Sequence, residues 1–186
     1  MHHYRDLIEI FNHCFQKSEN TRLIKGESEP IYLPANHLTD YHQIVFANGF
    51  FASGLHEIAH WCIAGKQRRL LEDYGYWYCP DGRDQQQQQA FEQVEVKPQA
   101  IEWAFSLAAD FPFQVSTDNL SGVQPDRAAF ESKVRKQLKH YQHYGFPPRA
   151  LIMIKALCSF YQVALKSVVF NEQTERKSKS VDRLTA

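Results

Sequence analysis

The chain has 186 residues, of which 44% are hydrophobic and 13% aromatic, enough apolar material for one domain with a sizeable core. Lys+Arg and Asp+Glu both number 21, so the zero formal charge is no sign of nucleic-acid or membrane binding. The sequence shows no apolar run as long as a membrane span and no signal peptide. Its four cysteines form no CxxC pair and are typical of reduced thiols. We therefore expect a cytoplasmic, monomeric protein that binds neither membrane nor nucleic acid directly.

Apolar residues recur at helical spacing near the start of the chain and predict an amphipathic helix. These residues are Tyr4, Leu7, Ile8, Phe11, Cys14 and Phe15. Three short extended segments follow, at Thr21–Lys25, residues 30–33 and residues 43–46, with turn-like residues between the first two. Short strands followed by a helix suit an α+β fold, in which helices pack on a small sheet.

The next helix carries His56, Glu57 and His60, the pattern HExxH. Two histidines four residues apart lie on one face of a helix, so both imidazoles can bind one metal ion with the Glu beside it. At about 100° per residue, several small or apolar residues share that face, which we therefore expect to be buried. They are Gly49, Ala52, Ser53, Ala59 and Ile63. Buried histidines without polar partners are costly, and a metal would satisfy them. The alternative is a chance pair of histidines at helical spacing.

An aromatic segment at residues 74–84 ends in a Pro-Asp-Gly turn. It contains Tyr76, Trp77 and Tyr78. Such a segment is either a core strand with a tight turn or one wall of a pocket beside the metal. The glutamine run that follows, at residues 85–89, predicts the exposed start of a helix.

Residues 91–109 are the second informative stretch. We expect one helix to end near residue 96, and Pro98 to lie in the first turn of another. The second helix would turn an apolar stripe toward the core. This stripe consists of Ile101, Ala104, Phe105 and Ala108.

Three glutamates in this stretch are candidates for a third metal ligand. Glu95 would share an inward face with Phe91 and Val94, whereas Glu102 would lie at the edge of the apolar stripe, open to water. A buried carboxylate needs a partner, which a metal held by the two histidines would supply. We rank Glu95 first, Glu102 second and Glu92 third. The alternative for Glu95 is an ion pair with a buried Arg or Lys.

Two basic stretches have no assigned partner. Lys66, Arg68 and Arg69 follow the HExxH helix, where they could interact with its C-terminus, be solvated, or form a binding patch. A later helix, capped by Asp126, has a basic outer face that is either simply solvated or a docking face for an acidic macromolecule. Residues 145–148 break the chain before a last helix at about 149–161. We expect residues 171–186 to be disordered, leaving residues 1–170 as a single catalytic, metal-binding domain.

Two histidines and one carboxylate leave coordination positions open, as in catalytic sites. With zinc, bound water becomes a nucleophile and Glu57 a general base, as in a metallopeptidase. With Fe(II), the same ligands form the triad of non-heme oxygenases. A third alternative is a non-enzymatic protein-binding module based on the basic helix. These ligand types alone do not decide between zinc and iron.

Five segments, in order along the chain, resemble the elongation factor P hydroxylase family of bacteria. They are residues 31–35, 56–65, 74–84, 94–100 and 118–120. The resemblance covers about residues 4–160. It implies an oxidoreductase of monooxygenase type that hydroxylates a lysine of elongation factor P already carrying a β-lysyl group, a post-translational modification of a translation factor. It also implies a two-histidine, one-carboxylate site, which maps onto His56, His60 and Glu95.

We therefore expect Fe(II), with zinc or another divalent metal as a substitute, and molecular oxygen as co-substrate. No signature of a 2-oxoglutarate site is recognisable. In this hypothesis Tyr76, Trp77 and Tyr78 wall the pocket, and Asp81 or Asp84 meets the ammonium groups of the modified lysine. Glu57 would relay protons or orient water. The expected fold is a mostly helical, single α+β domain with a small sheet and a zincin-like metal-binding helix.

Overall fold

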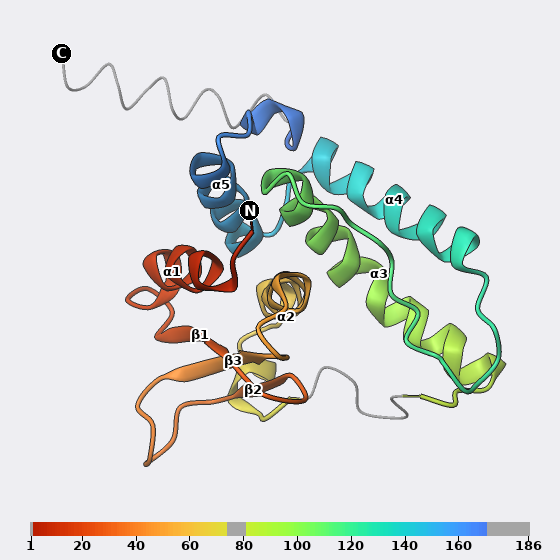
Figure 1. The fold of residues 1–186 in the computed structure, drawn as a ribbon, viewed down its shortest axis with the longest axis horizontal. Coiled ribbons are helices and arrows are strands. Elements are labelled where there is room, and N and C mark those ends of the chain that lie inside the picture. The colour runs from red at the N-terminus through yellow and green to blue at the C-terminus, as the bar shows by residue number, and fades with distance from the viewer. Residues whose placement is uncertain (1, 74–80, 171–186) are drawn as a thin grey trace.

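The computed structural model describes residues 2–73 and 81–170. Helix α1 (Tyr4–Phe15) precedes three strands, and helix α2 (Phe51–Ile63) follows them (Figure 1). The strands are β1 (Thr21–Lys25), β2 (Ile31–Leu33) and β3 (His42–Phe46). The remaining elements are η1 (Arg68–Leu70), α3 (Gln85–Ala108), α4 (Arg127–Tyr144), α5 (Pro148–Tyr161) and η2 (Leu165–Ser167).

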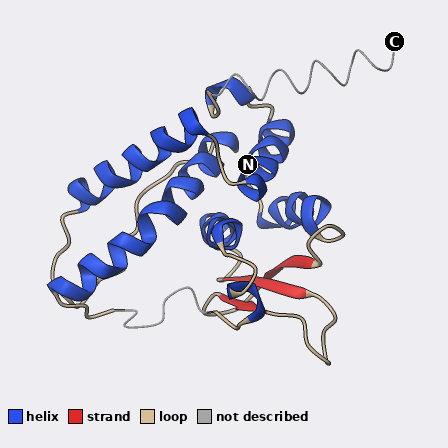
Figure 2. Cartoon of the chain, turned by 180° about the vertical axis from the view of Figure 1, so that it is seen from behind, coloured by secondary structure: helices blue, strands red, loops and turns tan. Residues whose placement is uncertain are grey.

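Strand β3 lies in the middle of the three-stranded sheet, parallel to β1 and antiparallel to β2. In the parallel pair Leu23 lies opposite Ile44, and both side chains are buried. Figure 2 shows the strands gathered at one end of the molecule and the helices α3, α4 and α5 at the other. The sheet therefore offers one apolar face on which helices can pack.

Helix α2 lies at the centre of the fold and is seen almost end-on in Figure 1. It contacts β3, α1, α3 and α5. Its buried residues include Leu55, Ile58, Ala59 and Cys62, which belong to the hydrophobic core. The packing of α2 in the core therefore fixes the position of the HExxH residues.

The structure confirms the predicted mostly helical α+β fold, including the first helix, the three strands and the last helix. Cys14, Cys62 and Cys158 are free thiols, as expected. Among the described residues, no helix is both long and apolar enough to span a membrane. The zincin-like character of α2 and the domain bounds stay predictions. The predicted disordered tail and the aromatic residues Tyr76, Trp77 and Tyr78 lie outside the described residues.

The predicted helix break before Pro98 is wrong, because α3 runs without interruption for 24 residues. It begins with a capping box, in which the Asp84 side chain accepts from the backbone N–H of Gln87 while the Gln87 side chain accepts from the backbone N–H of Asp84. Pro98 removes only the N–H that would bond the carbonyl group of Val94. Val94 is 51% exposed, so water can solvate that carbonyl, while α2, α4 and α5 all hold the helix in place.

A residue far along the chain caps the C-terminus of α2. The guanidinium of Arg149, in α5, donates from Nη2 to the carbonyl oxygens of Trp61, Cys62 and Ala64 at 2.9, 3.2 and 2.6 Å. Two of the basic residues that follow α2 pair with carboxylates: Arg69 with Glu19, and Arg68 with Asp73. Arg149 therefore ties α5 to the end of the HExxH helix.

Arg149→Met is expected to lower the free energy of unfolding by about 2–4 kcal/mol, because it leaves three carbonyl groups at the end of α2 without their charged donor. Chemical denaturation measures this change. Lys155→Met is the matched control, since Lys155 is an exposed residue of the same helix and its replacement should change stability by less than about 0.5 kcal/mol. Equal stability of the two variants would show that the Arg149 cap contributes nothing.

Candidate metal centre

Helices α2 and α3 bring two imidazoles and one carboxylate together. The Nε2 atoms of His56 and His60 lie 3.0 Å apart. Glu95 Oε1 lies 3.2 Å from His60 Nε2, and Glu95 Oε2 lies 3.7 Å from His56 Nε2. The three residues thus offer one ligand atom each within 4.8 Å of one another.

This donor set fits a single metal ion. Protein nitrogen and carboxylate ligands bind zinc-sized ions at about 2.0–2.2 Å, which places neighbouring ligand atoms about 2.8–3.6 Å apart, from octahedral to tetrahedral geometry. The separations of His60 Nε2 from its two neighbours lie in this range. Three protein ligands would leave further coordination positions open.

A second carboxylate, that of Glu102, contacts the ring nitrogen of His56 that does not belong to the ligand group. Glu102 Oε2 lies 2.8 Å from Nδ1 of His56, so the carboxylate accepts the Nδ1–H and leaves Nε2 free to bind a metal. The Glu102 side chain is only 12% exposed. The expectation that water solvates Glu102 at the edge of the stripe is therefore wrong, because α3 packs directly against α2 there.

Gln99, which sequence reasoning missed, holds Glu95 in place. Its Nε2 donates to Glu95 Oε2 at 3.2 Å and to the carbonyl oxygen of Ser116 at 2.8 Å, and its Oε1 accepts from the N–H of Ser116 at 3.0 Å. The residue is buried, so these bonds are shielded from water. The only signal in the sequence is that Gln99 follows Glu95 by one helical turn.

The face of α3 that carries Glu95 is polar, and not apolar as expected. Its buried members are Gln88, Glu92, Glu95 and Gln99. Phe91 is only half-buried and Val94 is exposed, so both were placed wrongly. Glu92 pairs with Nζ of Lys133, a residue of α4, at 3.0 Å. Of the three ranked glutamates, Glu95 alone lies within the candidate ligand group.

The ligand face of α2 is half open, which corrects the expectation of burial. The side chains of His56 and His60 are 24% and 20% exposed, and Ala52 on the same side is exposed. The larger apolar residues Leu55 and Ile58 take the core-facing side instead. The cluster is therefore reachable from solvent.

The charges of the cluster stabilise one another. Burial lowers the pKa of His56, but Glu102, Glu95 and Glu57 outweigh burial and raise that pKa well above its usual value. Burial likewise raises the pKa of Glu95, but His60 and His56 outweigh it and lower that pKa to about 2. Without a metal, His56 is therefore protonated and Glu95 ionised near neutral pH.

Metal binding is expected to release a proton from His56, because only the neutral imidazole can be a ligand. The affinity should then fall by about tenfold per pH unit as the pH drops below the raised pKa of His56. Isothermal titration with Fe(II) or Zn²⁺, in two buffers of different ionisation enthalpy, measures the protons released. An affinity that does not vary between pH 6 and 7 would contradict this expectation.

Asp81 and Asp84 have structural contacts. Asp81 accepts from the backbone N–H groups of Leu120 and Ser121 and from the Ser121 hydroxyl, and the bonds from Ser121 do most to lower the pKa of Asp81 to about 2. Asp84 caps α3. At 1.5 Å per residue, Asp84 lies about 16 Å from Glu95 along the helix. Asp84 thus holds the start of α3, Asp81 holds the loop at residues 120–121, and neither belongs to the candidate ligand group.

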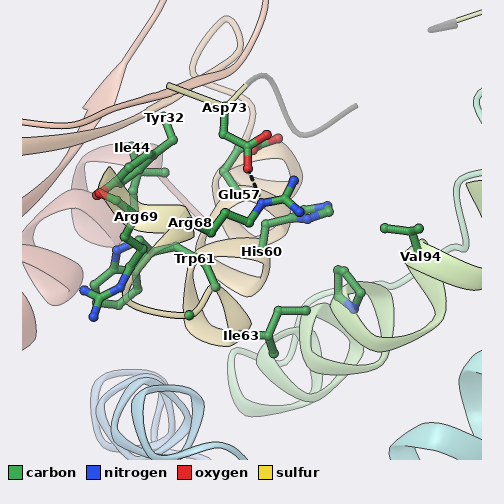
Figure 3. Close-up of a pocket in the computed structure, with 13 residues that line it drawn as sticks. Tyr32, Ile44, Glu57, His60, Trp61, Ile63, Arg68, Arg69, Asp73 and Val94 are labelled. Atoms are coloured by element: carbon green, nitrogen blue, oxygen red, sulfur yellow. Dashed lines mark hydrogen bonds and ion pairs between the residues drawn. The ribbon is translucent and has the colours of Figure 1, made fainter. Parts of the chain in front are cut away.

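Glu57 lies beside the ligands but outside their group. Its carboxylate faces a cavity of about 180 Å³ that is also lined by His60 (Figure 3). Burial raises the pKa of Glu57, and the neighbouring histidines only partly oppose this. The side chain is therefore placed to meet a substrate next to a metal.

The fold and the site together define a mostly helical α+β protein with a candidate two-histidine, one-carboxylate metal centre. The chain belongs to the Elongation factor P hydroxylase family, which it matches over residues 10–171. It is 54% identical over 160 residues to the Elongation factor P lysine hydroxylase of Haemophilus influenzae, an alignment that covers 86% of this chain and 90% of that protein. The resemblance inferred from the sequence motifs is thereby confirmed.

Proposed function

We propose that this protein hydroxylates a lysine of elongation factor P that already carries a β-lysyl group. The observation that carries the proposal is the convergence of His56, His60 and Glu95 in a chain of this family. The relative from Haemophilus influenzae is named a lysine hydroxylase of the same factor. Since the substrate is a translation factor, we also propose a cytoplasmic enzyme, acting as a monomer.

We propose Fe(II) as the resident metal. Bound iron would supply the activation of molecular oxygen, for which two histidines and one carboxylate leave positions open. Zinc fits the same ligands but has no redox chemistry, so it suits a peptidase better than a hydroxylase. Membership of a hydroxylase family therefore favours iron.

The residues around the ligands have separate tasks in this proposal. Glu102 keeps the Nδ1–H of His56 turned away from the metal position, and Gln99 orients the carboxylate of Glu95. Glu57 acts on the substrate side, where its carboxylate can hold or exchange a proton. His56 and His60 are reached from solvent, which lets a side chain of a folded protein approach.

The test is the intact mass of β-lysylated elongation factor P after incubation with the iron-loaded protein, oxygen and a reductant. Hydroxylation with molecular oxygen places one oxygen atom in the product and reduces the other to water. The reaction therefore takes two electrons from the reductant. A gain of one oxygen atom is expected, with no gain for factor kept under nitrogen. An unchanged mass with iron-loaded protein would refute the proposal, and cleavage of the factor would favour the peptidase.

A further inference from the structure

The cavity beside His60 has the size of one extended side chain. Its volume is about 180 Å³. Pockets for drug-sized ligands measure about 300–1,000 Å³, so a folded segment of polypeptide has no room here. The walls are aromatic and aliphatic, and are formed in part by Tyr32, Trp61, Ile63, Val94 and Pro98. Such walls suit a chain of methylene groups.

The arginines around this cavity are paired with carboxylates, whereas the carboxylate of Glu57 has only the neighbouring histidines as cationic groups beside it among the described residues. Arg68 Nε donates to Asp73 Oδ2 at 2.6 Å, drawn as a dashed line in Figure 3. Arg69 Nη1 donates to Glu19 Oε2 at 2.8 Å. Within residues 2–73 and 81–170, no hydrogen bond or ion pair reaches the carboxylate of Glu57. The arginines therefore have carboxylate partners, while the only cationic neighbours of Glu57 in the described part of the chain are the imidazoles of His56 and His60.

We infer that the cavity binds the primary ammonium end of an aliphatic side chain, with Glu57 as its counter-ion. A carboxylate held out of bulk water is costly, and since the neighbouring histidines offset that cost only in part, an ammonium group would offset more of it. An anionic ligand is disfavoured, since both arginines are already paired. His60 belongs to the cavity wall and to the ligand group, so the occupant lies next to the metal position.

This inference rests on the proposed function and names the recognition element of its substrate. A β-lysyl group attached through its carboxyl adds two primary ammonium groups to the modified lysine. The sequence-based hypothesis assigned these groups to Asp81 or Asp84, which are engaged elsewhere. Glu57 instead lies beside the ligands, and it distinguishes the β-lysylated factor from the factor whose lysine carries an acyl group without an amine.

The test is direct binding of elongation factor P to the full-length, iron-loaded protein without oxygen, so that no turnover occurs. Glu57→Gln is expected to weaken binding of the β-lysylated factor about 10- to 100-fold, the effect of losing one charge-assisted hydrogen bond. Binding of factor acetylated on the same lysine should not change. Glu131→Gln, which removes a carboxylate on α4, is the matched control and should bind both forms like the wild type.

Turnover separates recognition from proton transfer. The inference expects a raised KM in Glu57→Gln in addition to any fall in kcat from the lost proton role, and partial recovery of KM in Glu57→Asp, which keeps the charge. Unchanged binding by Glu57→Gln overturns the inference, including the case in which only kcat falls. If the wild type binds the β-lysylated factor in preference to the acetylated one but adds no oxygen, the inference stands and the proposed function fails.

Discussion

Replacing His60 by alanine is expected to abolish both metal retention and hydroxylation while leaving the fold intact. Only His56 and Glu95 would remain as ligands, too few to hold a metal firmly against solvent. The loss should exceed the 10- to 100-fold loss of metal affinity that is typical when only a supporting residue is removed. Since the His60 side chain is 20% exposed, its removal leaves no cavity in the core. His56→Ala should behave alike.

Iron content after anaerobic loading, together with the oxygen gained by β-lysylated elongation factor P, measures the effect of these changes. His37→Ala is the control, because His37 is exposed and lies in the loop between β2 and β3, outside the ligand group. Thermal unfolding followed by circular dichroism verifies that the variants are folded. Full iron occupancy in His56→Ala or in His60→Ala would refute the assignment of that residue.

Glu95→Ala is expected to weaken iron binding far more than Glu102→Ala. Glu95 offers an oxygen atom to the ligand group itself, whereas Glu102 contacts only Nδ1 of His56. Removing such a supporting partner typically costs about 10- to 100-fold in metal affinity. Glu102→Ala should thus stay measurable in a titration in which Glu95→Ala shows little binding.

The two glutamates form a matched pair, because both lie on the same face of α3, seven residues apart, and both are largely buried. Each variant is loaded with iron under identical anaerobic conditions, and its iron content is compared with that of the wild type. The reverse order, with metal kept in Glu95→Ala and lost in Glu102→Ala, would exchange the roles of the two residues.

The elements with clear periodicity could be predicted from the sequence. Helix α1, the strands and the histidine pair on α2 are indicated by the spacing of residues that are close together in the sequence. The continuity of α3 through Pro98 could not be predicted in this way. A local rule ends a helix at proline, but packing of α3 against α2, α4 and α5 overrides that preference.

Those residues of the candidate site that belong to short sequence motifs could be predicted, whereas contacts between distant residues could not. The HExxH pattern indicated both histidines, and the family motif indicated Glu95. The contact of His56 with Glu102 joins residues 46 apart, and the bonds from Arg149 to α2 span 85 to 88 residues. Such contacts follow from how the helices cross, which no short window of sequence specifies. The wrong inward placement of Val94 has the same origin.

The anchoring of α2 and α3 in the core has a consequence for how the proposed metal would be acquired. Leu55, Ile58 and Ile101 are fully buried on sides of these helices that do not face the ligand group. Folding therefore preorganises the ligands without help from an ion, unlike a zinc finger, whose folding requires its metal. The proposed metal would then bind to a protein that is already folded. Among divalent ions, imidazole and carboxylate ligands bind several metals more tightly than Fe(II), so the supply of ions in the cell would help to decide which metal the proposed site holds.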